Sequence, residues 1–323
     1  MSSDRTVLVG DVGGTNARFA IVETEPFRIT DRLELETADY ASFDAVLTAY
    51  LDRLGPERPH AAAIGVAGPV TGGRVTFTNR DWRASEDDLH RMGFKHALLI
   101  NDFAAAAFSV TGLQPEDLRT IGPELPGIGG EPITILGAGT GFGVSCLARY
   151  RGASLPVATE GGHASFAPQN AEQMEVRRIL AGRFGHVSIE RVLSGPGLHN
   201  LHVALSEMAG EKPATFHAAE IVQLAEAGHA ICVAALDMFC AIFGAVAGDF
   251  ALAHGARGGV YIAGGIAKKI EPILARSAFR AAFENKGRLT YYVEAVPTRL
   301  ILHDDMAFLG AALALQKFGV LRG

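Results

Sequence analysis

Two glycine-rich segments of this chain have nearly the same pattern, and both could bind a phosphate group. Their residues are Gly10, Asp11, Val12, Gly13, Gly14, Thr15 and Asn16 in the first, and Gly137, Ala138, Gly139, Thr140, Gly141, Phe142 and Gly143 in the second. Each lies between two apolar runs, which are Thr6–Val9 and Ala17–Glu23 for the first and Ile133–Leu136 and Val144–Tyr150 for the second. The pattern predicts a β-hairpin, because glycine adopts the positive φ angles that such turns need and has no Cβ to keep an anion away. Successive N–H groups would form a concave anion site, and two such sites predict a nucleotide held between two lobes.

Asp11 places an acid inside the first turn, where it would repel a phosphate. A Mg²⁺ ion that bridges Asp11 to the phosphate oxygens through water would remove this conflict. Alternatively, Asp11 could bond to its own backbone, as turn aspartates often do; the second hairpin favours the magnesium interpretation. The chain has no GxxxxGK[ST] sequence, and Phe142 interrupts a GxGxxG pattern, so neither a P-loop nor a Rossmann site is expected.

Asn101 and Asp102 follow a strand expected at Ala97–Ile100 and precede a helix expected at Phe103–Val110. Their side chains could serve only to cap this helix. Alternatively, Asp102 could accept the proton of an attacking hydroxyl group. The helix N-terminus would keep the carboxylate ionised, and a weak base suffices for phosphoryl transfer, whose loose transition state needs orientation more than early deprotonation.

Glu160 and His163 flank the glycine pair Gly161-Gly162, and Glu190 stands in a segment with a helix-then-turn pattern. The glycine pair excludes a regular helix and would let both polar side chains turn into one pocket. One His and one Glu without nearby cysteines make a zinc site a poor interpretation. The segment could be an ordinary glycine-rich loop, and Glu190 a helix-start acid. However, carboxylates, an amide and an imidazole suit a ligand with many hydroxyl groups, since each can bond to an OH.

Gly264 and Gly265 end the strand expected at Val260–Ala263 and lead into a helix. Tight packing would explain both glycines. A flat nucleoside that lies against bare backbone is the functional interpretation.

Length and composition limit the class of protein. With 323 residues the chain is expected to form two domains, and its net charge of −6 argues against nucleic acid as a partner. The three cysteines show no CxxC spacing, which favours a reducing cytoplasm over a disulfide framework. No signal peptide is expected, since a strand pattern starts at Thr6. The apolar stretch Ala230–Ala247 contains Asp237 and is predicted to be a buried core helix, so no membrane partner is expected.

The elements that must position these residues follow from periodicity and capping. Helices are expected at Ser42–Leu54, Phe103–Val110, Ala171–Phe184, Thr215–Glu226, 230–253 and Asp304–Phe318, the last with Asp304 as N-cap. Further strands are expected at Ala61–Val66 and Arg74–Thr78. Between Thr111 and Pro132, four prolines and five glycines separate short polar pieces, so we expect the chain to cross between lobes there.

On these residues the chain resembles bacterial glucokinases of the non-ROK type, within the hexokinase–actin–Hsp70 superfamily. The matching strings are LVGDVGGTNARFAIVE, INDFAAAA, GAGTGFGV, EGGHASFAP, ERVLSGPGL, VYIAGGI and FRAAFENKGR. They occur in family order from the first turn to about residue 288, so the resemblance covers nearly the whole chain. The zinc-binding cysteine cluster that is usual in ROK-family sugar kinases is missing.

The resemblance implies an α/β protein with a two-lobed ribonuclease H-like (actin-like ATPase) fold and a central cleft. Residues 1–112 with 304–323 would form a small α/β domain and residues 113–303 a large one. Asp102 would be the catalytic base for the sugar 6-hydroxyl. The residues expected to hold the sugar hydroxyls are Asn101, Asp102, Glu160, His163 and Glu190, with Asn79 as a weaker candidate. Those expected to bind ATP are Gly10–Asn16, Gly139, Thr140, Gly141, Gly264 and Gly265.

The expected function is therefore ATP-dependent phosphorylation of D-glucose at O6, the entry step of glycolysis, by a cytoplasmic homodimer. A Mg²⁺ ion would be held by Asp11 through water. One alternative is a kinase for another hexose, such as mannose, fructose or an N-acetylated sugar. Another is a sugar-sensing regulator without turnover, although the retention of Asp102 weighs against it. An actin- or Hsp70-like ATPase would leave the EGGH segment unexplained.

Overall fold

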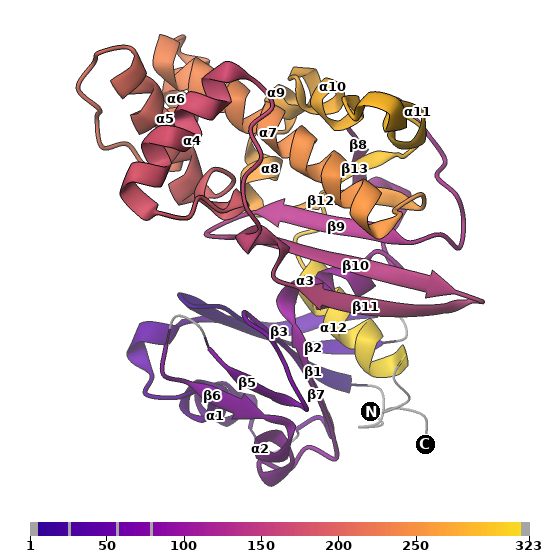
Figure 1. Cartoon of the computed structure of the whole chain (residues 1–323). Coiled ribbons are helices and arrows are strands. Elements are labelled where there is room, and N and C mark those ends of the chain that lie inside the picture. The colour runs from indigo at the N-terminus through magenta and orange to yellow at the C-terminus, as the bar shows by residue number, and fades with distance from the viewer. Residues whose placement is uncertain (1–5, 25–26, 56–57, 78–79, 318–323) are drawn as a thin grey trace. The chain divides into compact units, whose positions relative to one another are not determined.

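The computed structural model describes residues 6–24, 27–55, 58–77 and 80–317. The chain divides into two compact units, one made of Met1–Gln114 with His303–Gly323 and the other of Pro115–Leu302. Each unit contains a mixed β-sheet with helices packed on it (Figure 1).

The main sheet of the first unit has five strands in the order β3-β2-β1-β4-β7. Their bounds are β1 Thr6–Val12, β2 Asn16–Thr24, β3 Phe27–Glu36, β4 Ala61–Val66 and β7 His96–Asn101. The pairs β1–β2 and β2–β3 are antiparallel, whereas β4 is parallel to both β1 and β7. The first predicted hairpin is confirmed, since β1 and β2 pair up to Val12↔Ala17 and leave residues 13–15 for the turn.

Helices cover both faces of this sheet, because successive residues of β1 are apolar and point in opposite directions. Leu8 packs in one cluster with residues of α1 (Phe43–Leu54), and Val7 and Val9 pack with α12 (Met306–Lys317) on the other face. The unit is completed by α2 (Glu86–Arg91), α3 (Asp102–Ser109) and the small hairpin β5 (Arg74–Thr76) and β6 (Arg83–Ser85).

α12 lies directly against α3, the helix that follows the Asn101-Asp102 pair. The two backbones meet at Gly310, where a Cβ would lie 1.8 Å from the Ala105 carbonyl oxygen. Any side chain at this position would collide with the backbone of α3. The glycine therefore permits the close approach of α12 to α3, the helix that begins at Asp102, the predicted catalytic base.

The sheet of the second unit repeats the arrangement of the first. Its order is β11-β10-β9-β12-β13-β8, and the bounds are β8 Leu118–Thr120, β9 Ile133–Ala138, β10 Phe142–Tyr150, β11 Ala153–Thr159, β12 Gly259–Ala263 and β13 Thr298–Ile301. The pairs β9–β10 and β10–β11 are antiparallel, and β12 is parallel to β9 and β13. The second hairpin is also confirmed, with residues 139–141 as its turn.

The longest helix of the second unit, α7 (Ala230–His254), is the predicted core helix. Among the described residues it is the one helix that is long and apolar enough to cross a membrane, but 67% of its most apolar window is buried inside the protein. It is packed by α5 (Gly195–Met208), α6 (Ala218–Glu226) and α10 (Phe279–Glu284). The other helices are α4 (Ala171–Phe184), α8 (Gly265–Lys269), α9 (Glu271–Arg276) and α11 (Thr290–Val293).

Two expectations about local structure are wrong in detail, and a third is incomplete. The last helix begins at Met306, so Asp305 rather than Asp304 precedes it and accepts the first helical hydrogen bond. The segment Thr111–Pro132, where the chain was expected to cross between lobes, contains the boundary between the two units after Gln114 and also the edge strand β8, which pairs with β13. The Glu190 segment was expected to be a helix followed by a turn, but the order is reversed. The short 3-10 helix Ile189–Arg191 comes first, and α5 then begins after its N-cap Ser194, with a proline in its first turn.

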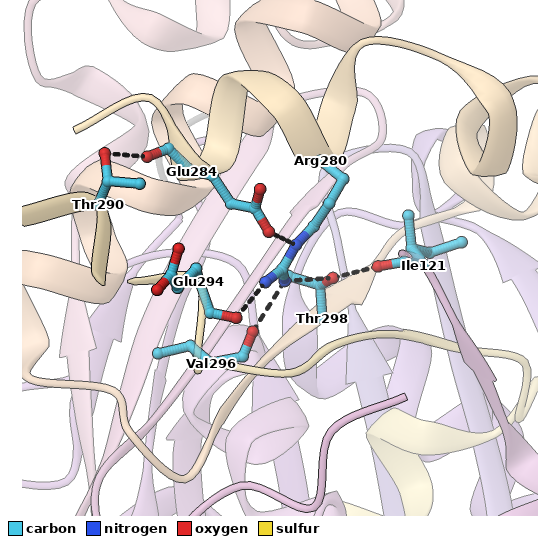
Figure 2. Close-up of polar contacts among 7 residues, drawn as sticks. All are labelled: Ile121, Arg280, Glu284, Thr290, Glu294, Val296 and Thr298. Carbon is cyan, nitrogen blue, oxygen red and sulfur yellow. Dashed lines mark hydrogen bonds and ion pairs between the residues drawn. The ribbon is translucent and has the colours of Figure 1, made fainter. Parts of the chain in front are cut away.

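A partly buried arginine fastens the edge of the second sheet, as Figure 2 shows. The Arg280 guanidinium, whose side chain is 12% exposed, donates four hydrogen bonds. Its acceptors are the Glu284 carboxylate at 2.7 Å, the carbonyl oxygens of Val296 and Glu294 at 2.8 Å each, and the Thr298 hydroxyl at 3.2 Å. The Thr298 hydroxyl in turn donates to the Ile121 carbonyl. One side chain therefore joins α10 to β13 and to the residue that follows β8.

Replacing Arg280 by Met should lower the free energy of unfolding by about 2–4 kcal/mol, because the variant leaves several acceptors without a donor. Urea unfolding followed by circular dichroism measures this. Arg178→Met is the control, since Arg178 pairs with Glu175 on an exposed face of α4 and its side chain is 72% exposed. We expect that variant to unfold at the wild-type urea concentration; equal losses in both variants would contradict the role given to Arg280.

Candidate functional site

The first predicted turn and the Asn101-Asp102 pair lie at the same edge of the first sheet. Because β1, β4 and β7 are parallel, their carboxyl ends meet at this edge. The register places Asp11 beside Gly65 and Asn101 beside Val66. A Cβ at Gly65 would lie 3.9 Å from the Asp102 Cα. Asp11 and Asp102 therefore flank a bare strand end.

The Asn101 side-chain amide connects two backbone segments at this edge, because it donates a hydrogen bond to one and accepts a hydrogen bond from the other. The side chain is 7% exposed; its Nδ2 donates to the Gly68 carbonyl at 3.2 Å, and its Oδ1 accepts from the Ala104 N–H at 3.0 Å. The predicted helix cap is thus present. Asp102 is half-buried, and its Oδ1 accepts from the Phe103 N–H at 2.8 Å. Its carboxylate lies at the N-terminus of α3, where the helix dipole favours an anion.

The backbone carbonyls of the first turn are held by two side chains that sequence reasoning missed. The buried Thr37 hydroxyl lies 2.8 Å from the carbonyl oxygens of both Gly14 and Thr15. Arg80 Nε donates to the Gly14 carbonyl at 3.0 Å. The C=O and N–H of a trans peptide point in opposite directions, so the Thr15 N–H points away from Thr37. The turn is therefore held through its carbonyl side.

Asp11 forms an ion pair with Arg18 of the neighbouring strand β2. Partial burial is the largest single effect and lowers the pKa of the Arg18 guanidinium, but Asp11, together with Glu34 and Asp305, more than offsets it, so that the pKa is raised overall. In the part of the chain that the structure describes, no group of three or more His, Cys, Asp or Glu side chains could hold a metal ion. A single carboxylate still fits Mg²⁺, which keeps several waters and binds through one or two carboxylates plus phosphate oxygens.

The second turn is fixed by backbone contacts on several sides. The Gly139 N–H donates to the Gly141 carbonyl at 2.8 Å, and the Gly139 carbonyl accepts from the Gly195 N–H, at the start of α5, at 2.9 Å. Gly264 has a φ of +91°, and a Cβ there would lie 2.3 Å from the Ala138 carbonyl oxygen. The predicted phosphate turn and the predicted nucleoside glycines therefore lie together in the second unit, with α8 beginning at Gly265.

The turn glycines do not have the positive φ angles that the sequence led us to expect. Gly13, Gly139 and Gly141 all lie outside that region. At Gly141 the reason for glycine is space, since a Cβ would lie 2.5 Å from Glu190 Oε2. At Gly139 a Cβ would meet nothing within 4 Å, so open space borders the turn.

Glu190 and the EGGH segment meet at the first residue of β10. Glu190 Oε2 accepts from the Phe142 N–H at 2.9 Å. The Phe142 carbonyl oxygen is approached by Gly162, where a Cβ would lie only 1.9 Å from it. Gly162 belongs to the 3-10 helix Gly161–His163. The backbone of Phe142 is thus contacted by Glu190 on one side and by the predicted sugar loop on the other.

Glu160 and His163 lie at the two ends of this 3-10 helix. His163 Nε2 is 3.9 Å from Glu160 Oε2, and the two side chains are 62% and 57% exposed, respectively. The Ile189 N–H donates to the Ala164 carbonyl at 2.9 Å and joins this loop to the Glu190 segment. The structure therefore brings the three residues predicted for the second unit into one region.

The remaining candidate, Asn79, lies outside the described residues. The contacts of Arg18, Thr37, Arg80 and Gly195 were not predicted. Arg18 had a signal, because the hairpin register pairs it with Asp11. Thr37 and Arg80 had none, since each reaches Gly14 across 23 and 66 positions of sequence, respectively.

Comparisons with known proteins identify the family and the fold of this chain. A family model described as Glucokinase matches residues 8–318. A glucokinase from Caulobacter sp. (strain K31) is 47% identical over 316 residues, which cover 97% of this chain and 95% of that protein. The crystal structure of a glucokinase from an Antarctic psychrotroph has a TM-score of 0.86 at 35% identity and covers 97% of this chain and 99% of its own. A ROK family glucokinase from Streptomyces griseus, solved with glucose and AMPPNP, has a TM-score of 0.65 at 20% identity, with coverages of 95% and 98%. The predicted actin-like ATPase fold is confirmed.

Replacing Gly162 by Ala should lower the melting temperature by about 5 °C or more, because the new Cβ would force the Phe142 carbonyl to move. Differential scanning calorimetry measures the change. Gly182→Ala in α4 is the matched control, since a Cβ there would meet nothing within 4 Å and alanine favours a helix. That variant should melt at or above the wild-type temperature. A Gly162→Ala protein as stable as Gly182→Ala would show that the close approach is not needed.

Proposed function

The chain belongs to the glucokinase family and phosphorylates glucose with ATP, and we propose that it does so at O6 with Asp102 as the catalytic base. The observation that carries the proposal is the position of Asp102 directly after β7 and at the N-terminus of α3. This sheet edge also carries the first glycine turn.

In this proposal Asp102 accepts the proton of the sugar 6-hydroxyl while O6 attacks the γ-phosphorus of ATP. The new bond joins O6 to phosphorus, the bond from phosphorus to the bridging oxygen of ADP breaks, and ADP leaves with that electron pair. Because the transition state is loose, the base acts mainly by orienting the hydroxyl. A positioned base of this kind contributes about 10²–10⁴-fold in rate.

The other sugar hydroxyls are assigned to Asn101, Glu160, His163 and Glu190. Their amide, carboxylates and imidazole supply both donors and acceptors for hydroxyl groups. A sugar that lacks one of the hydroxyls leaves a polar partner unpaired, at a cost of roughly 1–3 kcal/mol each. The arrangement of Glu160, His163 and Glu190 around one backbone segment supports a shared ligand for these three.

The phosphates are assigned to the turns Gly10–Asn16 and Gly139–Gly141, and the nucleoside to Gly264 and Gly265. Bare backbone beside open space at Gly139 supports the assignment. We assign Asp11 to a Mg²⁺ ion held through water; when bound, such an ion neutralises phosphate charge. Arg18 keeps the Asp11 carboxylate in place between β1 and β2.

Asp102→Asn should lower kcat at least about 100-fold and leave the glucose Kd within a few-fold of wild type, since the amide keeps the size of the side chain but accepts no proton. A coupled ADP-release assay with a panel of hexoses, a no-sugar blank and a no-magnesium control measures kcat and kcat/KM, and a glucose titration of the variant measures the Kd. Near-normal turnover of the variant would refute the base assignment. A higher kcat/KM for another hexose than for glucose would instead support the alternative substrate.

We also propose that the protein works as a cytoplasmic homodimer. All three cysteines are free and buried, which suits a reducing compartment. Tyr150 and Leu155, on the β10–β11 edge hairpin, are 70% and 56% exposed and offer an apolar surface to a second copy. Sedimentation should give twice the chain mass of 34.1 kDa. A monomer at all concentrations would exclude the dimer, and Leu155→Asp should produce one if this surface is the interface.

A further inference from the structure

We propose that Glu190 is a positioning residue that couples sugar binding to nucleotide binding through the Phe142 N–H. The inference rests on the proposed function, in which Glu190 holds a sugar hydroxyl and the turn beside it holds phosphate. The same carboxylate also fixes the backbone where the turn Gly139–Gly141 joins β10.

The contact is direct and closely fitted. Glu190 Oε2 accepts from the Phe142 N–H at 2.9 Å and lies 2.5 Å from the position of a Cβ at Gly141. Gly141 is the last residue of the turn and Phe142 the first of β10. The carboxylate therefore reaches the turn at the point where its backbone leaves the phosphate position and enters the sheet.

The carboxylate has an oxygen for each partner. Its Oε2 accepts from Phe142, and a carboxylate has a second oxygen with lone pairs for a hydroxyl donor. A sugar bound at Oε1 would restrict the rotation of the Glu190 side chain and so stabilise the bond at Oε2. The turn would then be ordered before the nucleotide arrives, which lowers the entropy cost of binding phosphate. By linkage, bound nucleotide would raise sugar affinity by the same factor.

Glu160 provides the contrast within the same region. Its side chain is 57% exposed, and its carboxylate lies 3.9 Å from His163 Nε2. Among the described residues, no N–H of the turn Gly139–Gly141 donates a hydrogen bond to the Glu160 carboxylate. Glu160 should therefore affect sugar binding without affecting the nucleotide, and it is the matched control for Glu190.

The test is calorimetric titration of the full-length protein with ADP in the presence of magnesium, with and without saturating glucose, and titration with glucose alone. Without sugar, Glu190→Ala should weaken ADP binding about tenfold, the effect of one charge-assisted hydrogen bond, and glucose should no longer tighten it. Glu190→Gln should keep ADP binding within about threefold of wild type, because its amide oxygen can accept from Phe142. Glu190→Gln should nevertheless bind glucose more weakly than the wild type, because the NH₂ group that replaces Oε1 is a donor rather than an acceptor. Glu160→Ala should weaken glucose binding and leave ADP binding unchanged.

The outcomes separate this inference from the proposed function. If Glu190→Ala binds ADP as well as the wild type while glucose binding is weakened, Glu190 is a sugar ligand only and the coupling is overturned. If neither Glu190→Ala nor Glu160→Ala changes glucose affinity, the sugar assignment itself fails. If Glu190→Ala does not fold, the Glu190→Gln variant alone decides. The coupling is supported if that variant keeps its ADP affinity, binds glucose more weakly, and gains less ADP affinity when glucose is added. It is overturned if glucose raises the ADP affinity of the variant as much as that of the wild type.

Discussion

In the second unit, the region that carries Glu160, His163 and Glu190 depends on one backbone contact, the approach of Gly162 to the carbonyl oxygen of Phe142. With 1.9 Å between that oxygen and the position of a Cβ, no other residue fits without a shift of the backbone. This contact joins the EGGH loop to β10, the strand that follows the turn Gly139–Gly141. Glu190 accepts a hydrogen bond from the N–H of the same residue, Phe142. The Phe142 backbone is thus held by a hydrogen bond at its N–H and by close packing at its carbonyl, which leaves the EGGH loop and the turn little freedom to move separately.

The first unit secures its turn by the opposite chemistry. A cation, Arg80, donates to the Gly14 carbonyl there, whereas an anion, Glu190, accepts from a backbone N–H in the second unit. Five strands of the second sheet, β11-β10-β9-β12-β13, repeat the order and direction of the first sheet, but the side chains that fix the turns are not equivalent. The repeat therefore extends to the backbone framework and stops at the polar contacts. Each unit therefore holds its glycine-rich turn in one conformation through a different set of side-chain contacts.

Much of this framework could be predicted, because hairpins and buried strands leave strong local patterns. Both glycine turns, the core helix α7 and the fold class are confirmed. The contacts of Thr37 and Arg80 were missed, since side chains that meet Gly14 across long stretches of sequence leave no local pattern. The φ angles at Gly139 and Gly141 were predicted wrongly for a related reason. Glycine was attributed to the turn itself, whereas at Gly141 the limiting neighbour is Glu190, 49 positions away by residue number, which only the folded chain reveals.

The ion pair between Asp11 and Arg18 changes the electrostatic argument at the first turn. An unpaired Asp11 carboxylate would repel phosphate, and for this reason the sequence predicts a metal ion there. Arg18 lies across the hairpin from it and already balances this charge. The Asp11–Arg18 pair is itself neutral before any ion binds. In the proposed function, the cation that a triphosphate brings would neutralise the phosphates themselves, and Asp11 would only orient its water shell. An Arg18 pair that stays formed would keep Asp11 from binding the ion directly, which agrees with the indirect coordination assigned to it.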